Sequence, residues 1–121
     1  MKRVLLVDDE AMNLLFLKKL CSHLHVSVDT ALNGDAAVEL FAQNRYDLVF
    51  MDIHMPVMNG LDALNKIREM EIEFGYHTPV VAITSDSGIH ESMVRASSFD
   101  EMVFNPINIE LIRSILTKYL L

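Results

Sequence analysis

Short runs of apolar residues alternate along this chain with segments in which apolar residues recur every three or four positions. The runs are four to seven residues long and rich in valine, leucine, isoleucine and phenylalanine, a pattern typical of strands that are buried on both faces. We therefore expect five strands, at residues 3–7, 26–31, 46–51, 78–84 and 101–104.

The periodic segments between these runs predict amphipathic helices with one apolar face. The predicted helices cover residues 11–24, 35–42, the segment around 64–70, a weaker segment at about 89–98, and 109–120. Strands that alternate with helices predict an α/β fold, in which a doubly wound parallel sheet carries helices on both faces. We see no linker or repeat, so residues 1–121 are expected to form one domain.

The composition narrows the possible functions. The net charge is −7, with 17 acidic and 10 basic residues, and the basic residues are scattered, which argues against nucleic-acid binding. No apolar run approaches the ~20 residues of a membrane span, and the N-terminus lacks the apolar region of a signal peptide. The single cysteine, Cys21, excludes an internal disulfide and is expected to be a buried structural thiol. We expect a cytoplasmic protein without membrane or nucleic-acid partners.

Polar residues stand where the predicted strands end. Ligands of such sheets bind outside the carboxyl ends of the strands, so these residues are expected to share one site. The residues are Asp8, Asp9, Asp52, Thr84, Ser85 and Asn105. Clustered carboxylates repel one another, and a hard divalent cation such as Mg²⁺ relieves that repulsion. A carboxylate can also attack phosphorus and form an aspartyl phosphate.

Other interpretations of the polar residues are less specific. Capping of helices fits Asp35 and could fit Asp9, but a proline-containing loop separates Asp52 from the next helix. The remaining candidates are predicted to be solvated, namely Glu69, Glu71 and Glu73 on one exposed helix face, and His23, His25, His77 and His90 in turns and loops.

Three segments carry a resemblance to a known family. "VLLVDDE", "DLVFMDIHMPVMNG" and "TPVVAITSD" resemble the response-regulator receiver domain of two-component signalling, and the similarity extends over essentially the whole chain. The third predicted helix and the "YHTPVVAIT" that follows look most like receivers that serve hybrid sensor kinases. The resemblance implies a flavodoxin-like sheet with strand order 2-1-3-4-5.

The resemblance also implies a role for each residue of the site. Asp52 would accept the phosphoryl group, and Mg²⁺ would be the cofactor. Asp9 and Asp52 would bind the metal directly, Asp8 largely through water, and His54 through its backbone carbonyl. Thr84 would donate its hydroxyl to the phosphoryl group and move inward on activation.

Two positions depart from the family pattern. Asn105 stands where the family has a lysine that pairs with the phosphoryl oxygen, and Met102 stands where the family usually has a switching aromatic residue. A neutral amide makes a weaker hydrogen bond than an ammonium does. We therefore predict that Asp52 can be phosphorylated but that the modified state is less strongly coupled to a conformational switch. His54 and Asp86 occupy the family's two variable positions that influence how fast the phosphoryl group is lost.

The implied function is that of a signalling module rather than an enzyme. It would take a phosphoryl group from a histidine kinase or histidine phosphotransfer protein and signal by contact with a downstream protein, as a monomer or weak dimer. One alternative is a pseudo-receiver that binds partners without phosphorylation. A small Mg²⁺-dependent phosphatase with Asp52 as nucleophile ranks lower, because no cap insertion is present. A flavin-binding module ranks lowest, since "DDEAMN" has acids where a phosphate-binding loop needs Ser, Thr or Gly.

Overall fold

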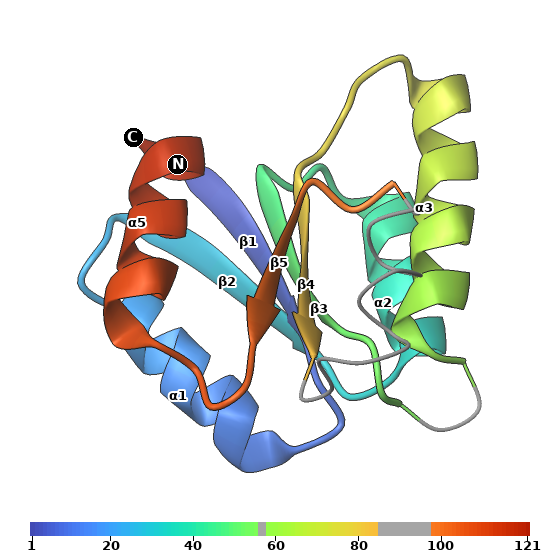
Figure 1. Cartoon of the computed structure of the whole chain (residues 1–121). Coiled ribbons are helices and arrows are strands. Elements are labelled where there is room, and N and C mark those ends of the chain that lie inside the picture. Colours follow the sequence, from blue (N-terminus) through green and yellow to red (C-terminus); the bar gives the residue numbers. More distant parts are fainter. Residues whose placement is uncertain (56–57, 85–97) are drawn as a thin grey trace.

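The computed structural model describes residues 1–55, 58–84 and 98–121, and its centre is a five-stranded parallel sheet (Figure 1). The strands lie in the order β2-β1-β3-β4-β5, and every neighbouring pair is parallel. The expected fold and strand order are therefore confirmed. The strands are β1 (Lys2–Val7), β2 (Val26–Ala31), β3 (Leu48–Asp52), β4 (Val80–Thr84) and β5 (Glu101–Phe104).

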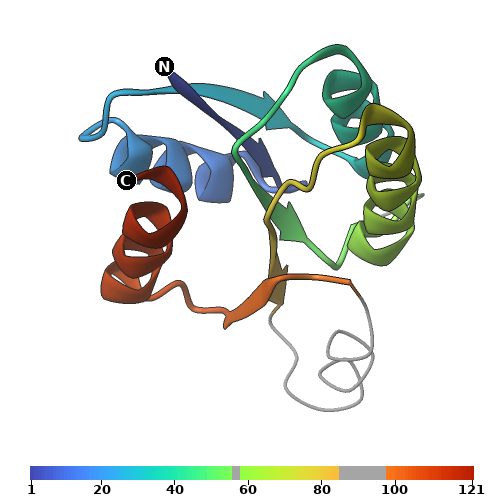
Figure 2. The ribbon, with the colours of Figure 1, turned by 90° about the horizontal axis from the view of Figure 1, so that it is seen from above.

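Four helices within the described ranges cover the two faces of the sheet. α1 (Ala11–Cys21) and α5 (Ile109–Leu120) lie on one face, and α2 (Gly34–Gln43) and α3 (Gly60–Phe74) lie on the other (Figures 1 and 2). The weak helix predicted at about 89–98 falls almost entirely on residues outside the described ranges. None of the helices in the described part of the chain has the length and apolar character needed to cross a bilayer.

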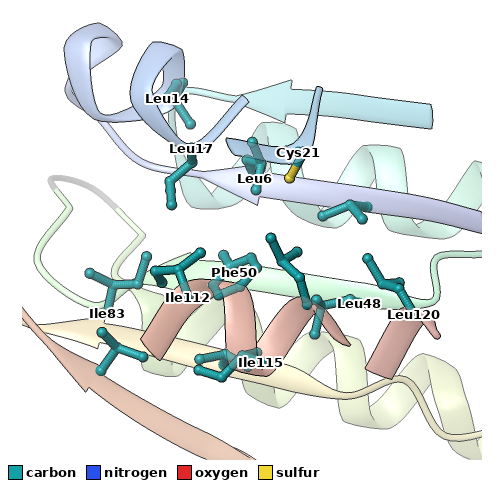
Figure 3. Packing of buried hydrophobic residues seen from close by; sticks show 14 residues of the cluster. Leu6, Leu14, Leu17, Cys21, Leu48, Phe50, Ile83, Ile112, Ile115 and Leu120 are labelled. Atoms are coloured by element: carbon teal, nitrogen blue, oxygen red, sulfur yellow. The ribbon is translucent and has the colours of Figure 1, made fainter. Parts of the chain in front are cut away.

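Alternation along the strands divides the core into two layers. In β1, Val4 and Leu6 face α1 and α5, whereas Leu5 and Val7 face α2 and α3. Figure 3 shows the first layer, where side chains of α1 and α5 meet those of the sheet. The thiol of Cys21 lies in this layer at 2% exposure, and burial raises its pKa to about 11, which confirms the expected structural cysteine. Burial on both faces fixes the register of β1, β3 and β4, because a one-residue slip would exchange the two layers.

The ends of the helices follow from local sequence. The side chains of Asn33, Asn59 and Asn108 accept backbone N–H groups at the starts of α2, α3 and α5, as helix-capping asparagines do. Gly75 ends α3 with a φ of 80°, a left-handed conformation that favours glycine. α1 ends at Cys21 rather than at Leu24, and its C-terminal turn is closed by the N–H of Ser22.

One prediction about α3 is wrong. Glu71 is only 8% exposed, although its spacing from Glu69 and Glu73 predicted a shared solvated face. Glu71 lies one helical turn after the buried Ile67, so helix geometry turns it inward, while Glu69 and Glu73 point to solvent. Its carboxylate binds Arg68 at 2.7 Å and accepts the N–H of Thr78.

His77 is solvated, as predicted, but it also has a partner within the fold. Its ring is 58% exposed, but Nε2 lies 2.8 Å from a carboxylate oxygen of Asp100. His23 and His25 are both exposed, as predicted for the turn after α1.

Candidate functional site

Three carboxylates meet at the edge of the sheet that follows the carboxyl ends of β1 and β3. In Figure 1 this is the edge at which the strand arrows point. Asp8 and Asp9 follow β1, and Asp52 is the last residue of β3. Each offers an oxygen within 4.8 Å of the other two, which is close enough for one metal ion. The structure thus brings together the acids that the sequence placed at the ends of these two adjacent strands.

Asp8 forms the buried base of this cluster, with an exposure of 1%. One carboxylate oxygen accepts the N–H of Glu10 at 2.9 Å, and the other accepts the side-chain amide of Asn13 at 3.2 Å. Burial raises the pKa of Asp8, although these two hydrogen bonds oppose the shift. Both bonds come from the start of α1, so this helix fixes the orientation of the carboxylate.

Asp52 is a nearly buried carboxylate with a strongly raised pKa. It is 8% exposed, and its Oδ1 accepts the backbone N–H of His54 at 3.1 Å. Burial, followed by the negative charge of Asp8, raises the pKa of Asp52 to about 7. A carboxylate that is costly to ionise, beside two others, favours a bound cation or a change that removes its charge.

The chain around Asp52 is packed too tightly for a side chain at Gly60. A Cβ there would lie 2.5 Å from the carbonyl oxygen of Asp52 and 2.8 Å from the Cα of Ile53. The N–H of Gly60 donates to the carbonyl of Ile53 at 3.0 Å. The first residue of α3 therefore rests directly on the backbone that carries Asp52.

Thr84 ends β4 and is fully buried. Its hydroxyl oxygen lies 3.2 Å from Nε2 of His54, and its carbonyl accepts the N–H of Asn105 at 2.7 Å. These contacts connect the ends of β3, β4 and β5 across the site. Ser85 and Asp86 lie outside the described residues.

Asn105 lies at the wall of a cleft of about 530 Å³ in front of the carboxylates. The peptide bond between Asn105 and Pro106 is cis. The amide of Asn105 carries no charge, and among the described residues that line the cleft no lysine or arginine replaces the missing ammonium. The lining residues are Asp9, Glu10, Asn13, Phe16, Asp52, His54, Asn105, Pro106 and Ile107.

Met102 lies outside this cleft. It is partly buried and packs against Ile53 and Ala82 in a small apolar cluster at the sheet. This position in β5 fits a side chain that fills space against the neighbouring strand.

Two residues of α1 contribute to the site without having been predicted from the sequence. Asn13 binds Asp8, and Phe16 forms part of the cleft wall. A signal for both was present, because α1 starts two residues after Asp9 and its first turns must lie near the end of β1. The contact between His54 and Thr84 had no such signal, since it depends on how far one side chain reaches across the site.

Comparisons with known proteins agree with this arrangement. The family model of the response regulator receiver domain matches residues 4–117. The chain is 35% identical over 117 residues to the autoinducer 1 sensor kinase/phosphatase LuxN of Vibrio campbellii. It is 31% identical over 122 residues to the hybrid signal transduction histidine kinase I of Dictyostelium discoideum. These alignments span 97% and 95% of this chain but 13% and 7% of the relatives.

Solved structures show the same architecture. The response regulator TrrA of Thermotoga maritima, in complex with Mg²⁺ and BeF, superimposes with a TM-score of 0.85 at 31% sequence identity. The alignment covers 99% of this chain and all of that one. The chemotaxis protein CheY4 of Vibrio cholerae has a TM-score of 0.85 at 25% identity, with 99% of both chains covered.

Proposed function

Because this chain belongs to the response regulator receiver domain family, a signalling module of two-component and phosphorelay systems, we propose that its Asp52 accepts a phosphoryl group from a phosphohistidine. One observation carries the proposal. Asp9 and Asp52 line one open cleft, the buried carboxylate of Asp8 lies within 4.8 Å of both, and Asp52 has a pKa raised to about 7. We propose that residues 1–121 act together as this receiver domain.

The transfer exchanges one bond to phosphorus for another. An Asp52 carboxylate oxygen forms the new O–P bond while the N–P bond of the phosphohistidine breaks, and the departing imidazole nitrogen keeps the electron pair. The N–H of His54 holds the Asp52 carboxylate in a fixed orientation during this exchange. The Thr84 hydroxyl then donates a hydrogen bond to an oxygen of the transferred group.

The carboxylates suit Mg²⁺, an ion that prefers oxygen ligands and keeps several waters. We assign Asp9, Asp52 and the backbone carbonyl of His54 as direct ligands, and Asp8 as a ligand through water. The tight hydrogen bonding of Asp8 to Glu10 and Asn13 supports its outer role. Bound Mg²⁺ would supply positive charge that neutralises the carboxylates and the phosphoryl oxygens. TrrA, at 31% identity, was solved with Mg²⁺ and BeF, which supports this assignment.

Asn105 sets this receiver apart. Its amide can donate a neutral hydrogen bond to the phosphoryl group, and such a bond is about half as strong as one from an ammonium. We therefore propose that phosphorylation occurs but that it biases the conformation of the domain less than a lysine would allow. The same residue favours a second candidate function, a pseudo-receiver that binds its partner without phosphorylation.

The partner that donates the phosphoryl group would be a histidine kinase or a histidine phosphotransfer protein. The sensor and hybrid kinases among the relatives support this, although the chain spans only 13% or less of those proteins. We propose that the domain acts by contact with a downstream protein, as a monomer or weak dimer and without catalysing a reaction of its own. The contact face would include β5 and α5.

A phosphorylation assay decides between the two candidate functions. The domain is incubated with Mg²⁺ and acetyl phosphate, and the modified residue is located by mass spectrometry. We expect a labile adduct on Asp52 that is absent from Asp52→Asn. A wild type that takes up no label while Asn105→Lys does so would identify a pseudo-receiver. Turnover of a generic phosphate ester at a rate that depends on Asp52 would instead indicate the phosphatase.

A further inference from the structure

The imidazole ring of His54 has no part in the transfer described above, yet it contacts the hydroxyl of Thr84, which does. We propose that His54 is a positioning residue, whose imidazole Nε2 holds the Thr84 hydroxyl in the unmodified protein. Thr84 must leave this hydrogen bond to reach a phosphoryl group on Asp52. The inference rests on the proposed function, since it concerns how the same site is switched.

The two contacts of His54 come from different parts of the residue. Its backbone N–H donates to Oδ1 of Asp52 at 3.1 Å, and its Nε2 lies 3.2 Å from the hydroxyl oxygen of Thr84. The backbone contact fixes residue 54 relative to the acceptor carboxylate, so the position of the ring is defined from there. A single residue thus links the phosphoryl acceptor on β3 to the hydroxyl on β4.

Thr84 is held in a way that leaves its side chain as the part able to rotate. Its backbone belongs to β4, and its carbonyl accepts the N–H of Asn105 at 2.7 Å. Threonine has two heavy atoms on Cβ, so its side chain moves between a few discrete rotamers. Because Thr84 is fully buried, its hydroxyl cannot exchange one partner for water without a penalty. The bond to His54 therefore favours one rotamer over the others.

The hydrogen bond between His54 and Thr84 matters more in this chain than it would if a lysine stood at position 105. Among the described lining residues, the cleft has no ammonium or guanidinium to fix the phosphoryl oxygens, so the interactions of the Thr84 hydroxyl form a larger share of what distinguishes the two states. A net hydrogen bond of ordinary strength corresponds to a change of about 2- to 10-fold in an equilibrium constant. Loss of the hydrogen bond from His54 should change, by that factor, the equilibrium between the Thr84 rotamer held by His54 and the rotamer that reaches the phosphoryl group.

Two variants of His54 test the contact with Thr84, because their side-chain amides differ in length. In His54→Gln the terminal amide can reach about as far as Nε2, whereas in His54→Asn it stops at about the position of Nδ1. The first measurement uses the unmodified protein, in which three-bond couplings to the Thr84 methyl group report its χ1 rotamer. We expect one rotamer in wild type and His54→Gln, and averaged couplings in His54→Asn. Unchanged couplings in His54→Asn would overturn the hydrogen bond, whatever happens at Asp52.

The second measurement is the affinity for beryllofluoride in the presence of Mg²⁺. We expect His54→Asn to bind it about 2- to 10-fold more tightly than wild type does, and His54→Gln to stay within about twofold of wild type. The gain should vanish in a Thr84→Val background, which keeps the shape of the side chain and removes the hydroxyl. A gain that persists there, or weaker binding by His54→Asn, would contradict the release step. If wild type does not bind beryllofluoride, the proposed function is contradicted, and so is the release of Thr84 from His54 on phosphorylation. The three-bond couplings of Thr84 would still test the hydrogen bond in the unmodified protein.

Discussion

The guanidinium of Arg68 on α3 lies 2.8 Å from the carboxylate of Asp100, just before β5 begins. The same guanidinium donates to the carbonyls of Thr78 and Ser98, at 2.8 and 2.7 Å, and pairs with the buried Glu71. One side chain thus joins α3 to the segments that enter β4 and β5. These contacts lie at the amino ends of the strands, at the opposite edge of the sheet from Asp52, so they concern the stability of the fold.

Replacement of Arg68 should therefore destabilise the protein well beyond the usual effect of a surface change. Arg68→Met leaves the carboxylate of Glu71, 8% exposed, without its charged partner, and removing one partner of a buried pair is costly. We expect the free energy of unfolding to fall by about 2–4 kcal/mol, measured by urea denaturation. Lys66→Met, at an exposed position of the same helix, is the matched control and should change it by less than about 0.5 kcal/mol. Equal effects of the two variants would show that the Arg68 contacts do not stabilise the fold.

The contacts of Asp100 make the free energy of unfolding depend on pH in a defined way. Burial alone would raise the pKa of Asp100, but hydrogen bonds from the N–H of Val80 and from His77, together with the charge of Arg68, hold it below the ordinary value of 3.8. A lowered pKa means that the ionised form stabilises the folded state above pH 3.8, and that this stabilisation is lost as the pH falls through the native pKa. Between about pH 5 and pH 3, the difference in unfolding free energy between wild type and Asp100→Asn should therefore shrink as the pH falls. A difference that grows on acidification would contradict the assignment.

Removing the charge of Asp52 should stabilise the domain when no divalent cation is present. The pKa of Asp52 is raised to about 7 by burial and by the charge of Asp8, so at pH 8 the folded protein holds an ionised carboxylate at a cost. In EDTA at pH 8, Asp52→Asn should raise the unfolding free energy by about 1–2 kcal/mol. Millimolar Mg²⁺ should stabilise wild type and leave the variant nearly unchanged. Stabilisation of the variant by Mg²⁺ as large as that of wild type would place the ion elsewhere.

Because Gly60 lies close to the backbone of Asp52, any larger residue at position 60 should clash with that backbone. In Gly60→Ala the new methyl group would meet the backbone of Asp52 and Ile53 at 2.5–2.8 Å, and backbone yields less easily than a flexible side chain. We expect a loss of about 1–3 kcal/mol in unfolding free energy and slower labelling of Asp52 by acetyl phosphate. Gly75→Ala is the control, because the methyl group there meets nothing within 4 Å and only the φ of 80° opposes it. It should cost about 1 kcal/mol and leave labelling unchanged.

The parts of the molecule that sequence predicted well depend on regular geometry. Asp8, Asp52, Thr84 and Asn105 could be placed at one edge because each follows a run of apolar residues, and parallel strands end at the same edge of a sheet. The direction of Glu71 was wrong because the alternate spacing of three glutamates was interpreted as one face, whereas a helix separates the middle one from its neighbours. The contact between His54 and Thr84 could not be predicted from the sequence, since the loop that carries His54 has no periodicity from which to infer a side-chain direction.

Restoring the family's lysine should strengthen the response to a phosphoryl mimic. Asn105 lines a cleft whose described lining residues include no lysine or arginine, and a charge-assisted hydrogen bond is about twice as strong as a neutral one. We expect Asn105→Lys to bind beryllofluoride with Mg²⁺ about 10-fold more tightly than wild type does, measured by titration of backbone amide shifts. Asn65→Lys on the exposed surface of α3 makes the same change in net charge and should alter the affinity by less than about twofold. If both lysines raise the affinity equally, the effect is one of overall charge, and Asn105 does not contact the phosphoryl group.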